Sequence, residues 1–452
     1  MRMFLQATLI VALSLLLFSP VVEAAPVNDL VGTIQDLTDF PQDVSAYLPK
    51  SGADVPYLTT RQQEELFKSY LKEFFSPWDS DDDGELSKGW SLSITKKDRW
   101  GENLLPITQK IKDGLVQDVS MESFPAMDKK AIVVFNTSAR FLPTMRPFFA
   151  NPEEAGEGYP FDYLQNTALW VGVPVRARHV NGKGDWLLCR TGTIPGWVPA
   201  RDVAFVDDAF IKKYRTGRYM AVVEDDVSIC DEKSSFLVRT HIGAVLPICE
   251  EREETFVVYV PLRTVDGTVA LCKGIVRKGD GAEMPVPFSA EGVARLASKL
   301  MGKTYGWGGM YENRDCSATV RDLVSPFGLW LPRDSGPQSK SNTYIDVEKE
   351  PWKRKLELIA EKGLPFRTII GLRGHVGLYL GLWKGRPALL HNTWGVRLLT
   401  SDPDVTGRAI LGRTVITSLR PGIERKDVAK EGLLPKVRTI TFLPGFDGTE
   451  KK

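Results

Sequence analysis

Apolar residues recur at helical spacing in three stretches of the chain. The first stretch is Thr60–Phe75, and its apolar positions are Leu66, Phe67, Tyr70, Leu71, Phe74 and Phe75. This spacing predicts an amphipathic helix that Thr60 caps. A second helix is predicted after the cap residue Ser289, and a third begins near Cys316 and ends at Pro326.

Between about residues 130 and 280 the pattern changes to short runs of β-branched and aromatic residues. Examples are AIVVF at 131–135, GVPVRARHV at 172–180, WLLCRT at 186–191, GWVPARDVAFV at 196–206 and TFVVYVPLR at 255–263. Strands of this length, separated by Gly, Asp and Asn turns, predict two small β-barrels and not βαβ units. We expect Trp186 and Trp197 to fill the barrel cores, with stacking on a ligand as the alternative. His179 is expected at a surface or hydrogen-bonded polar position.

Two further strands are predicted over GHVGLYLGLW at 374–383 and ALLHNTWG at 388–395. His375 lies on the first strand and His391 on the second. Because side chains alternate along a strand, the register decides whether the two imidazoles share a face. A hairpin centred on Lys384 places them on one face. A turn centred between residues 384 and 385 places His391 on the opposite face unless a bulge intervenes.

The stretch TYGWGGMYENRDCSATVRDL, residues 304–323, carries the candidate chemistry. It delivers Cys316 to the first turn of the third helix, where unpaired N–H groups and the helix dipole favour an anion. We therefore expect a lowered thiol pKa and a reactive thiolate. A lone cysteine at a helix start is also common in protein cores. His375 and His391 follow it, however, in the order of nucleophile, base and orienting residue that a cysteine hydrolase needs.

Composition excludes several classes of partner. The chain has 452 residues, 43% hydrophobic and 25% charged, which is ordinary for a globular protein of about three domains. Its net charge of +1 gives no electrostatic case for binding nucleic acid or a strongly anionic membrane. Any polymer would have to be held in a groove by specific contacts.

The cysteines, histidines and acidic residues show no metal-binding pattern. Setting Cys316 aside, the other four cysteines could form two disulfides or remain thiols, and they are Cys189, Cys230, Cys249 and Cys272. The acidic loop Asp79–Gly84 resembles a calcium loop, but Trp90 stands where the bidentate Glu is needed. We interpret it as a solvated turn and expect neither a metal nor another cofactor.

The N-terminal segment Met1–Ala24 has the pattern of a secretory signal. Arg2 precedes an apolar run that is too short to span a membrane, and Val22-Glu23-Ala24 form a small-residue cleavage site. An uncleaved N-terminal anchor is the alternative. We expect cleavage after Ala24, export to the periplasm or the medium, and no membrane span in the mature protein.

Four motifs of the C-terminal third resemble the NlpC-type (NlpC/P-sixty) cell-wall cysteine endopeptidases. In order they are YGWGG with DCSATVRDL, LPRDSGPQ at 331–338, RGHVGLYLG and LHNTWG, within about 150 residues that begin at Ser289. Two other segments resemble domains found beside such enzymes. GWVPARDVAFV is similar to the closing segment of a bacterial SH3-like domain, and FFSPW at 74–78 is similar to part of an N-terminal stabilising region.

The resemblance implies roles for seven residues. Cys316 would be the nucleophile, His375 the base and His391 the residue that orients it, although the His–His spacing is a few residues longer than the family pattern. Tyr305 would position the substrate or the oxyanion. Asp315, Ser317 and Trp307 would contact the substrate, with Asp315 pairing with a free N-terminal amine, capping the helix, or both.

The resemblance also implies a multidomain architecture, in which a papain-like α+β catalytic domain follows two small SH3-like β-barrels and a mostly helical N-terminal region. The expected segments are a signal peptide at 1–24, a helical stabilising region at 25–125, SH3-like domains at 126–212 and 213–280, and the NlpC-type peptidase domain at 281–452. One barrel is expected to help close one end of the catalytic cleft.

The function implied is hydrolysis of the bond between γ-D-glutamate and a diamino acid, diaminopimelate, in murein peptides with a free N-terminal L-alanine. The alternatives are a murein-binding module without hydrolase activity and a papain-like acyltransferase. We expect a monomer. The sequence does not distinguish intact wall from released peptide, or the organism's own wall from a foreign one.

Overall fold

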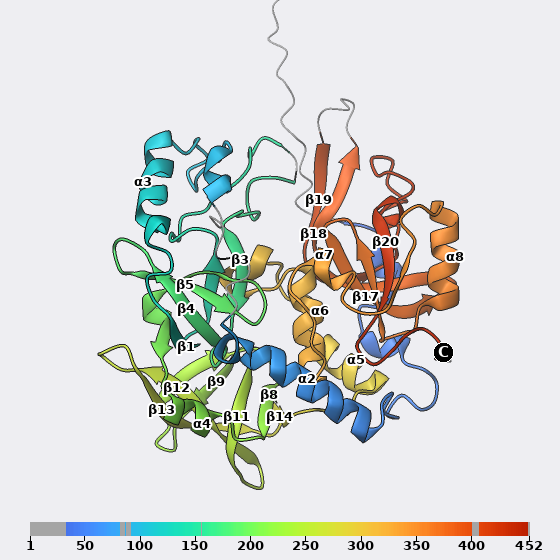
Figure 1. Ribbon diagram of the computed structural model, residues 1–452. Coiled ribbons are helices and arrows are strands. Elements are labelled where there is room, and N and C mark those ends of the chain that lie inside the picture. Colours follow the sequence, from blue (N-terminus) through green and yellow to red (C-terminus); the bar gives the residue numbers. More distant parts are fainter. Residues whose placement is uncertain (1–32, 82–85, 87–91, 155, 400–405, 451–452) are drawn as a thin grey trace, which may run out of the picture.

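A computed structural model describes residues 33–81, 86, 92–154, 156–399 and 406–450 (Figure 1). The predicted signal segment lies outside these residues, and so do residues 82–84 of the acidic loop. Among the described residues, no helix has the length and apolar character needed to cross a membrane. Three sheets organise the chain, two in small β domains and one in the C-terminal domain.

The N-terminal region is helical, as predicted. Its α-helices are α1 (Asp36–Asp39), α2 (Thr60–Asp79) and α3 (Gln109–Val119). The cap of α2 lies one residue earlier than expected. Thr59 forms the capping box with Gln62, because each can bond the other's backbone N–H. Gln63 is instead free to turn inward and donates hydrogen bonds to two backbone carbonyls of the C-terminal domain.

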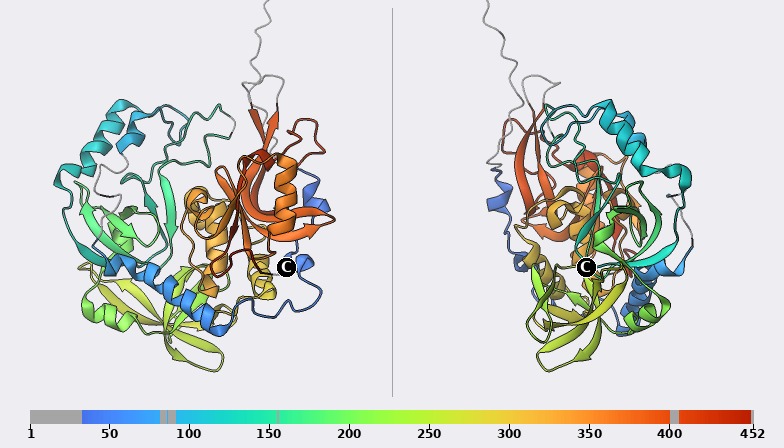
Figure 2. Two further views of the ribbon diagram at one scale, coloured as in Figure 1. Left: turned by 45° about the vertical axis from the view of Figure 1, so that its right-hand side comes forward. Right: turned by 90° about the vertical axis from the view of Figure 1, so that its left-hand side faces the viewer.

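The helix α2 joins the domains. Figure 2 shows it running from the first β domain to the C-terminal domain. Near its start, Gln63 Nε2 donates to the Phe327 carbonyl (2.9 Å), and at its middle the Tyr70 hydroxyl bonds Ser325 Oγ (2.7 Å). At its end, Trp78 Nε1 donates to the carbonyl of Ala131 in the first β domain (2.8 Å). The aromatic face predicted from the sequence is therefore the surface against which the β domains and the C-terminal domain meet.

The first β domain contains seven strands in the order β3-β2-β6-β5-β4-β1-β7. The strands are β1 (Lys129–Val133), β2 (Thr137–Arg140), β3 (Gln165–Leu169), β4 (Pro174–Val180), β5 (Trp186–Thr191), β6 (Gly196–Pro199) and β7 (Val203–Phe205). Trp186 and Trp197 are buried in its core, which confirms the packing role over ligand stacking. His179 is buried and hydrogen-bonded to the backbone of Ala126 and Val119.

The second β domain also contains seven strands, in the order β10-β9-β13-β12-β11-β8-β14. They follow α4 (Asp208–Tyr214) and are β8 (Tyr219–Val222), β9 (Val227–Cys230), β10 (Phe236–Thr240), β11 (Val245–Glu251), β12 (Thr255–Arg263), β13 (Val269–Arg277) and β14 (Gly281–Glu283). All five cysteines are free thiols in the structure. Of the two alternatives that the sequence left open, the structure therefore has thiols and not disulfides.

The C-terminal domain packs helices against a six-stranded sheet of order β15-β20-β16-β17-β18-β19. Its helices are α5 (Ala290–Leu300), α6 (Cys316–Val324), α7 (Ser335–Gln338) and α8 (Trp352–Lys362). Its strands are β15 (Tyr344–Asp346), β16 (Thr368–Leu372), β17 (His375–Trp383), β18 (Arg386–Leu399), β19 (Thr406–Thr417) and β20 (Val437–Phe442). Figure 1 shows α6 at the centre of the molecule, between this sheet and the β domains.

The register of β17 and β18 contains the bulge that the sequence analysis offered as one alternative. The turn is centred between Lys384 and Gly385, since Trp383 pairs with Arg386. That register alone would put His391 on the wrong face. The pairing shifts by one residue between Tyr379 and Gly381, so that Leu378 lies opposite Leu390. The extra residue returns His391 to the face of His375.

Candidate active site

Cys316 is the first residue of α6. Asp315 caps this helix, because its side chain accepts a hydrogen bond from the Ala318 N–H (2.9 Å). The helix packs its apolar side in the main core of the C-terminal domain, and Cys316 itself is 7% exposed. Its thiol lies against the backbone N–H of Val376, the residue after His375. The helix cap and the sheet therefore hold the sulfur beside the start of β17.

His375 and His391 are brought together across β17 and β18. His375 Nε2 lies 2.7 Å from His391 Nδ1, and the two rings meet edge to face. His391 is almost fully buried, while His375 keeps one side open. This contact with the buried His391 limits the orientations open to the ring of His375.

A buried threonine on β19 fixes the tautomers of both histidines. The Thr417 hydroxyl donates to the Ser418 carbonyl (2.8 Å), so its oxygen must accept from His391 Nε2–H (3.0 Å). His391 Nδ1 then carries no proton and accepts from His375 Nε2–H. The remaining nitrogen of His375, Nδ1, is left as a free base. The direction of these hydrogen bonds follows from the Ser418 carbonyl, because a carbonyl oxygen can only accept.

The protonation state of the resting site differs from the sequence expectation. Burial, followed by the carboxylate of Asp315, raises the pKa of Cys316 to about 12. Burial, followed by the positive charge of Lys436, lowers the pKa of His375 to about 4. The expected lowered thiol pKa was therefore wrong, because burial outweighs the helix N-terminus. At neutral pH the site holds a neutral thiol and a neutral imidazole.

Arg333 is a site residue to which the sequence analysis gave no role. It lies in the LPRDSGPQ motif, and it ion-pairs with Asp315 (2.5 Å) and donates to the Ser317 hydroxyl. It also donates to Thr167 Oγ1 of the first β domain (3.1 Å). Burial alone would raise the pKa of Asp315, but Arg333 keeps it below its ordinary value. Asp315 thus caps α6 as a carboxylate that is already paired.

The Gly-rich turn before the nucleophile fits against the first β domain. Gly308 and Gly309 have positive φ angles of 58° and 84°, and a Cβ on Gly308 would lie 2.5 Å from the Gln165 carbonyl oxygen. The turn N–H of Gly308 donates to Asp315 Oδ2 (3.1 Å). The close approach of the two domains therefore requires glycine here.

Aromatic side chains from both domains form one wall beside the nucleophile. Phe161 of the first β domain contacts Trp307, Trp394 and Tyr305, with ring centroids 5.2, 6.2 and 6.5 Å apart. Tyr305 is nearly buried, and burial together with Cys316 raises its pKa well above the ordinary value. Its hydroxyl is therefore a neutral hydrogen-bonding group. The first β domain thus contributes a side chain to this aromatic wall.

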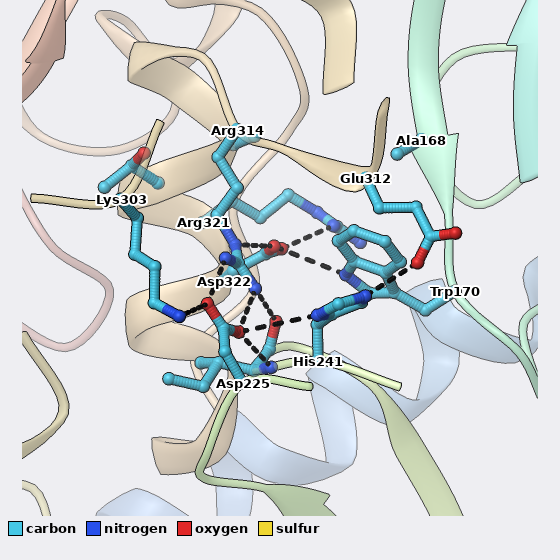
Figure 3. Close-up of polar contacts among 12 residues, drawn as sticks. Ala168, Trp170, Asp225, His241, Lys303, Glu312, Arg314, Arg321 and Asp322 are labelled. Atoms are coloured by element: carbon cyan, nitrogen blue, oxygen red, sulfur yellow. Dashed lines mark hydrogen bonds and ion pairs between the residues drawn. The ribbon is translucent and has the colours of Figure 1, made fainter. Parts of the chain in front are cut away.

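A buried charge network anchors the second β domain to the nucleophile loop (Figure 3). Arg314, which immediately precedes Asp315, pairs with Asp225 (2.9 Å) of the second β domain and with Asp322 (2.8 Å) of α6. The Arg314 carbonyl accepts from Asn392 Nδ2 (2.9 Å), next to His391. Both β domains thus contact the loop that delivers Cys316.

All seven residues singled out from the sequence lie in this region, and two others join them. Arg333 could be noticed because it belongs to a quoted motif, but its contacts with Thr167 and Asp315 span the fold. Thr417 gave no sequence signal, since a threonine in a β-strand is ordinary. Among the described residues, no group of three His, Cys, Asp or Glu side chains could hold a metal ion.

Four family models match successive parts of the chain. The model of the NlpC/P60 family matches residues 302–406. The N-terminal NLPC_P60 stabilising domain matches 7–124, the SH3 domain of SH3b1 type matches 147–199, and the SH3 domain of SH3b2 type matches 207–253. The multidomain architecture expected from the sequence is confirmed by these matches.

Two known proteins are similar to this chain. One is a γ-D-glutamyl-L-lysine dipeptidyl-peptidase from Bacillus cereus (strain ATCC 10987 / NRS 248), 26% identical over 189 residues, which are 37% of this chain and 53% of the relative. The match spans about half the length of that relative. The other is the structure of an NlpC/P60 endopeptidase from Photobacterium damselae subsp. piscicida, with a TM-score of 0.80 and 26% identity, covering 90% of this chain and 97% of that one.

Proposed function

Because the chain carries an NlpC/P60 domain preceded by two SH3 b-type domains, we propose that it is a cysteine peptidase of cell-wall peptides. The bond cut would join γ-D-glutamate to diaminopimelate in murein peptides with a free N-terminal L-alanine. The observation that carries the proposal is the chain of hydrogen bonds from Thr417 through His391 to His375, which leaves Nδ1 of His375 unprotonated. His375 immediately precedes Val376, whose backbone N–H lies against the Cys316 thiol.

The neutral resting pair determines the first step of the proposed mechanism. His375 Nδ1 accepts the thiol proton as the Cys316 sulfur attacks the γ-glutamyl carbonyl carbon, because neither group is ionised beforehand. A C–S bond forms and the carbonyl oxygen becomes an oxyanion. The Cys316 backbone N–H and the neutral Tyr305 hydroxyl are the proposed donors to that oxygen.

Collapse of this intermediate breaks the C–N bond. The leaving amine takes the proton from the His375 imidazolium, and an acyl thioester remains on Cys316. Water then attacks the thioester carbonyl while His375 accepts one of its protons, and the thiol recovers that proton as it leaves. His391 holds the His375 ring throughout without adding a second buried charge.

Recognition of the free amine by Asp315 is a further part of the proposal. Its carboxylate already has four donors, and they are Ala318 N, Ser317 Oγ, Gly308 N and Arg333 Nη2. A carboxylate has about four acceptor positions, so a substrate ammonium would have to displace one of these contacts. Ser317 and Trp307, which lie beside Asp315 and in the aromatic wall, are the other proposed substrate contacts.

Export is proposed together with this substrate, since murein lies outside the cytoplasm. The proposed leader is Met1–Ala24, with cleavage after Ala24.

Product analysis tests the proposal. L-Ala-γ-D-Glu-meso-diaminopimelate and its N-acetylated form are incubated with the wild type and with Cys316→Ala, and the products are identified by mass spectrometry. We expect L-Ala-D-Glu from the free peptide only, and none with the variant. Equal cleavage of both peptides would remove Asp315 as the amine contact, and no cleavage by folded wild type would contradict the peptidase.

A further inference from the structure

Four cations gather at the end of the sheet where His375 lies. Arg373 forms the turn before His375, and its N–H donates to the Lys436 carbonyl (2.7 Å) just before β20. Arg397 on β18 and Arg408 on β19 are direct cross-strand partners. In Figure 1 these two strands extend beyond the others at the top of the domain. Two of the cations therefore come from the connections before β17 and β20, and two come from the strands β18 and β19. All four lie at one end of the sheet.

The cluster is destabilising without a ligand. Like charges directly opposite each other weaken a strand pair. Burial, together with Arg408, Arg397 and Arg373, lowers the pKa of Lys436 below its ordinary value. Burial and Arg397 likewise lower the pKa of Arg408. The protein thus holds these charges close together at a cost.

The described part of the chain offers the cluster few acids. Among these residues, Arg397, Arg408 and Lys436 form no ion pair within 4.0 Å, and Arg373 has only Glu348 at 3.9 Å. Nε of Arg408 is buried without a hydrogen-bond partner in the same part of the chain. Acidic residues are not scarce overall, since the sequence has 57 of them against 58 basic ones.

The first β domain borders the cluster on its other side. The Arg408 guanidinium packs against Gly156, where a Cβ would lie within 2.4 Å of Nη2. The acid that faces Arg408 there is Glu157, whose carboxylate accepts a hydrogen bond from the Tyr163 hydroxyl (2.9 Å). This acid also lies outside ion-pair distance, so no acid of the described residues lies within 4.0 Å of Arg397, Arg408 or Lys436.

The position of the cluster relative to the proposed reaction indicates which part of a substrate it meets. The leaving amine must lie on the side of His375, because that residue supplies its proton. Lys436 is near enough to His375 for its charge to be felt there. The paired Asp315 and Arg333, by contrast, are assigned by the proposed function to the amine end of the acyl group. The cations are therefore placed beside the leaving diamino acid.

Resting on the proposed function, we infer that Arg397, Arg408, Lys436 and Arg373 form a subsite for the carboxylates of the leaving diamino acid. Diaminopimelate carries two carboxylates, one at the α-carbon and one at the end of its side chain. Lysine carries only the first. Both diamino acids have a side-chain ammonium, so the side-chain carboxylate is the difference that the cluster can bind. The subsite therefore favours the more acidic leaving group.

Kinetics with four peptides test this subsite and identify which carboxylate it binds. They are L-Ala-γ-D-Glu-meso-diaminopimelate, the same peptide amidated on its side-chain carboxylate, the same peptide amidated on its α-carboxylate, and L-Ala-γ-D-Glu-L-lysine. Three enzymes are compared: the wild type, the double variant Arg397→Gln/Lys436→Gln, and the control double variant Lys353→Gln/Lys362→Gln on α8. The four substituted positions are exposed, and both double variants lose two positive charges. Thermal melting verifies that each is folded.

We expect amidation of at least one carboxylate to lower the wild-type kcat/KM by about 10- to 150-fold, the range of one charge-assisted hydrogen bond. In Arg397→Gln/Lys436→Gln, the ratio of kcat/KM for the unmodified peptide to kcat/KM for its amide should fall close to one. The control variant should keep the wild-type ratio. A loss confined to the side-chain amide, with a matching loss for the lysine peptide, identifies the side-chain carboxylate; a loss confined to the α-amide identifies the other.

Three results would overturn the inference. If the wild type cleaves all four peptides at similar rates, or if the double variant keeps the wild-type ratio, the cations do not bind the leaving group although the peptidase stands. If folded wild type cleaves none of them, the proposed function fails and the subsite fails with it.

Discussion

Replacing Thr417 by valine removes the last member of the hydrogen-bond chain and should impair catalysis without changing the shape of the core. Thr417 is fully buried, and valine has nearly the same volume and branching. The change takes away the oxygen that accepts the His391 Nε2–H at 3.0 Å. The tautomer of His375 then depends on which nitrogen of His391 carries the proton.

Two responses are open to His391, and both penalise the active tautomer. The proton may stay on Nε2, where it is buried without an acceptor, at about 1–3 kcal/mol. It may instead move to Nδ1, which then donates to His375 Nε2 and forces the His375 proton onto Nδ1. That tautomer cannot accept a proton from Cys316. At about 1.36 kcal/mol per tenfold, the loss in kcat is about 5- to 160-fold.

Steady-state kinetics on the diaminopimelate peptide measure this loss, with Thr417→Ser as the matched control that keeps the oxygen. We expect Thr417→Val to lower kcat with little change in KM, and Thr417→Ser to recover most of the rate. A valine variant within about twofold of wild type would refute the tautomer argument. So would equal losses in both variants, because the oxygen would then have no special role.

Three further predictions follow from the site and its supports. Because the pKa of His375 is lowered to about 4, its neutral form persists at mild acidity, and kcat/KM should fall only as the pH drops through about 4; an acidic limb near 6.5 would contradict this. Arg314→Leu leaves the buried Asp225 with the longer contacts to Lys303 (3.7 Å) and His241 (3.9 Å), and it should lower the free energy of unfolding by about 3–5 kcal/mol in urea titrations, whereas a loss below about 1 kcal/mol would count against the network. Deleting Leu380 removes the bulge and turns His391 to the opposite face, so activity should vanish while circular dichroism stays native; retained activity would show that the register is unimportant.

Local sequence signals were sufficient for the helices and their caps. Ser289 and Asp315 both accept from backbone N–H groups of the helices they precede, as residues of their type do. The cap of α2 was misplaced by one residue, because Thr59 and Thr60 are both able caps with a glutamine three residues on. The structure selects Thr59, since Gln63 instead donates to backbone carbonyls of the C-terminal domain. Such choices depend on a difference of a few atoms.

The register of the histidine strands was only partly predictable. The chemistry required His375 and His391 to share a face, and this limited the hairpin to two solutions. The sequence could not choose between them, since the bulge after Tyr379 depends on how Gly381 packs, with its φ of 111°, against the neighbouring segment. Functional reasoning was thus more informative here than propensity.

Contacts between distant segments and their electrostatic consequences were beyond the sequence. Arg333 meets Asp315 through the fold of the C-terminal domain, and it meets Thr167 because the first β domain packs against that domain. The thiol pKa was predicted in the wrong direction for the same reason. A helix N-terminus is visible in a sequence, but the depth at which Cys316 is buried is not.

Detection of the acyl-enzyme is the most direct test of the central claim, that Cys316 attacks the γ-glutamyl carbonyl. The wild type is mixed with L-Ala-γ-D-Glu-meso-diaminopimelate, quenched in acid within milliseconds to seconds, and analysed by intact-protein mass and peptide mapping. The account predicts an L-Ala-γ-D-Glu thioester on Cys316 that forms before free dipeptide accumulates and is absent in Cys316→Ala. Dipeptide release by the variant, or an adduct on any other residue, would contradict it.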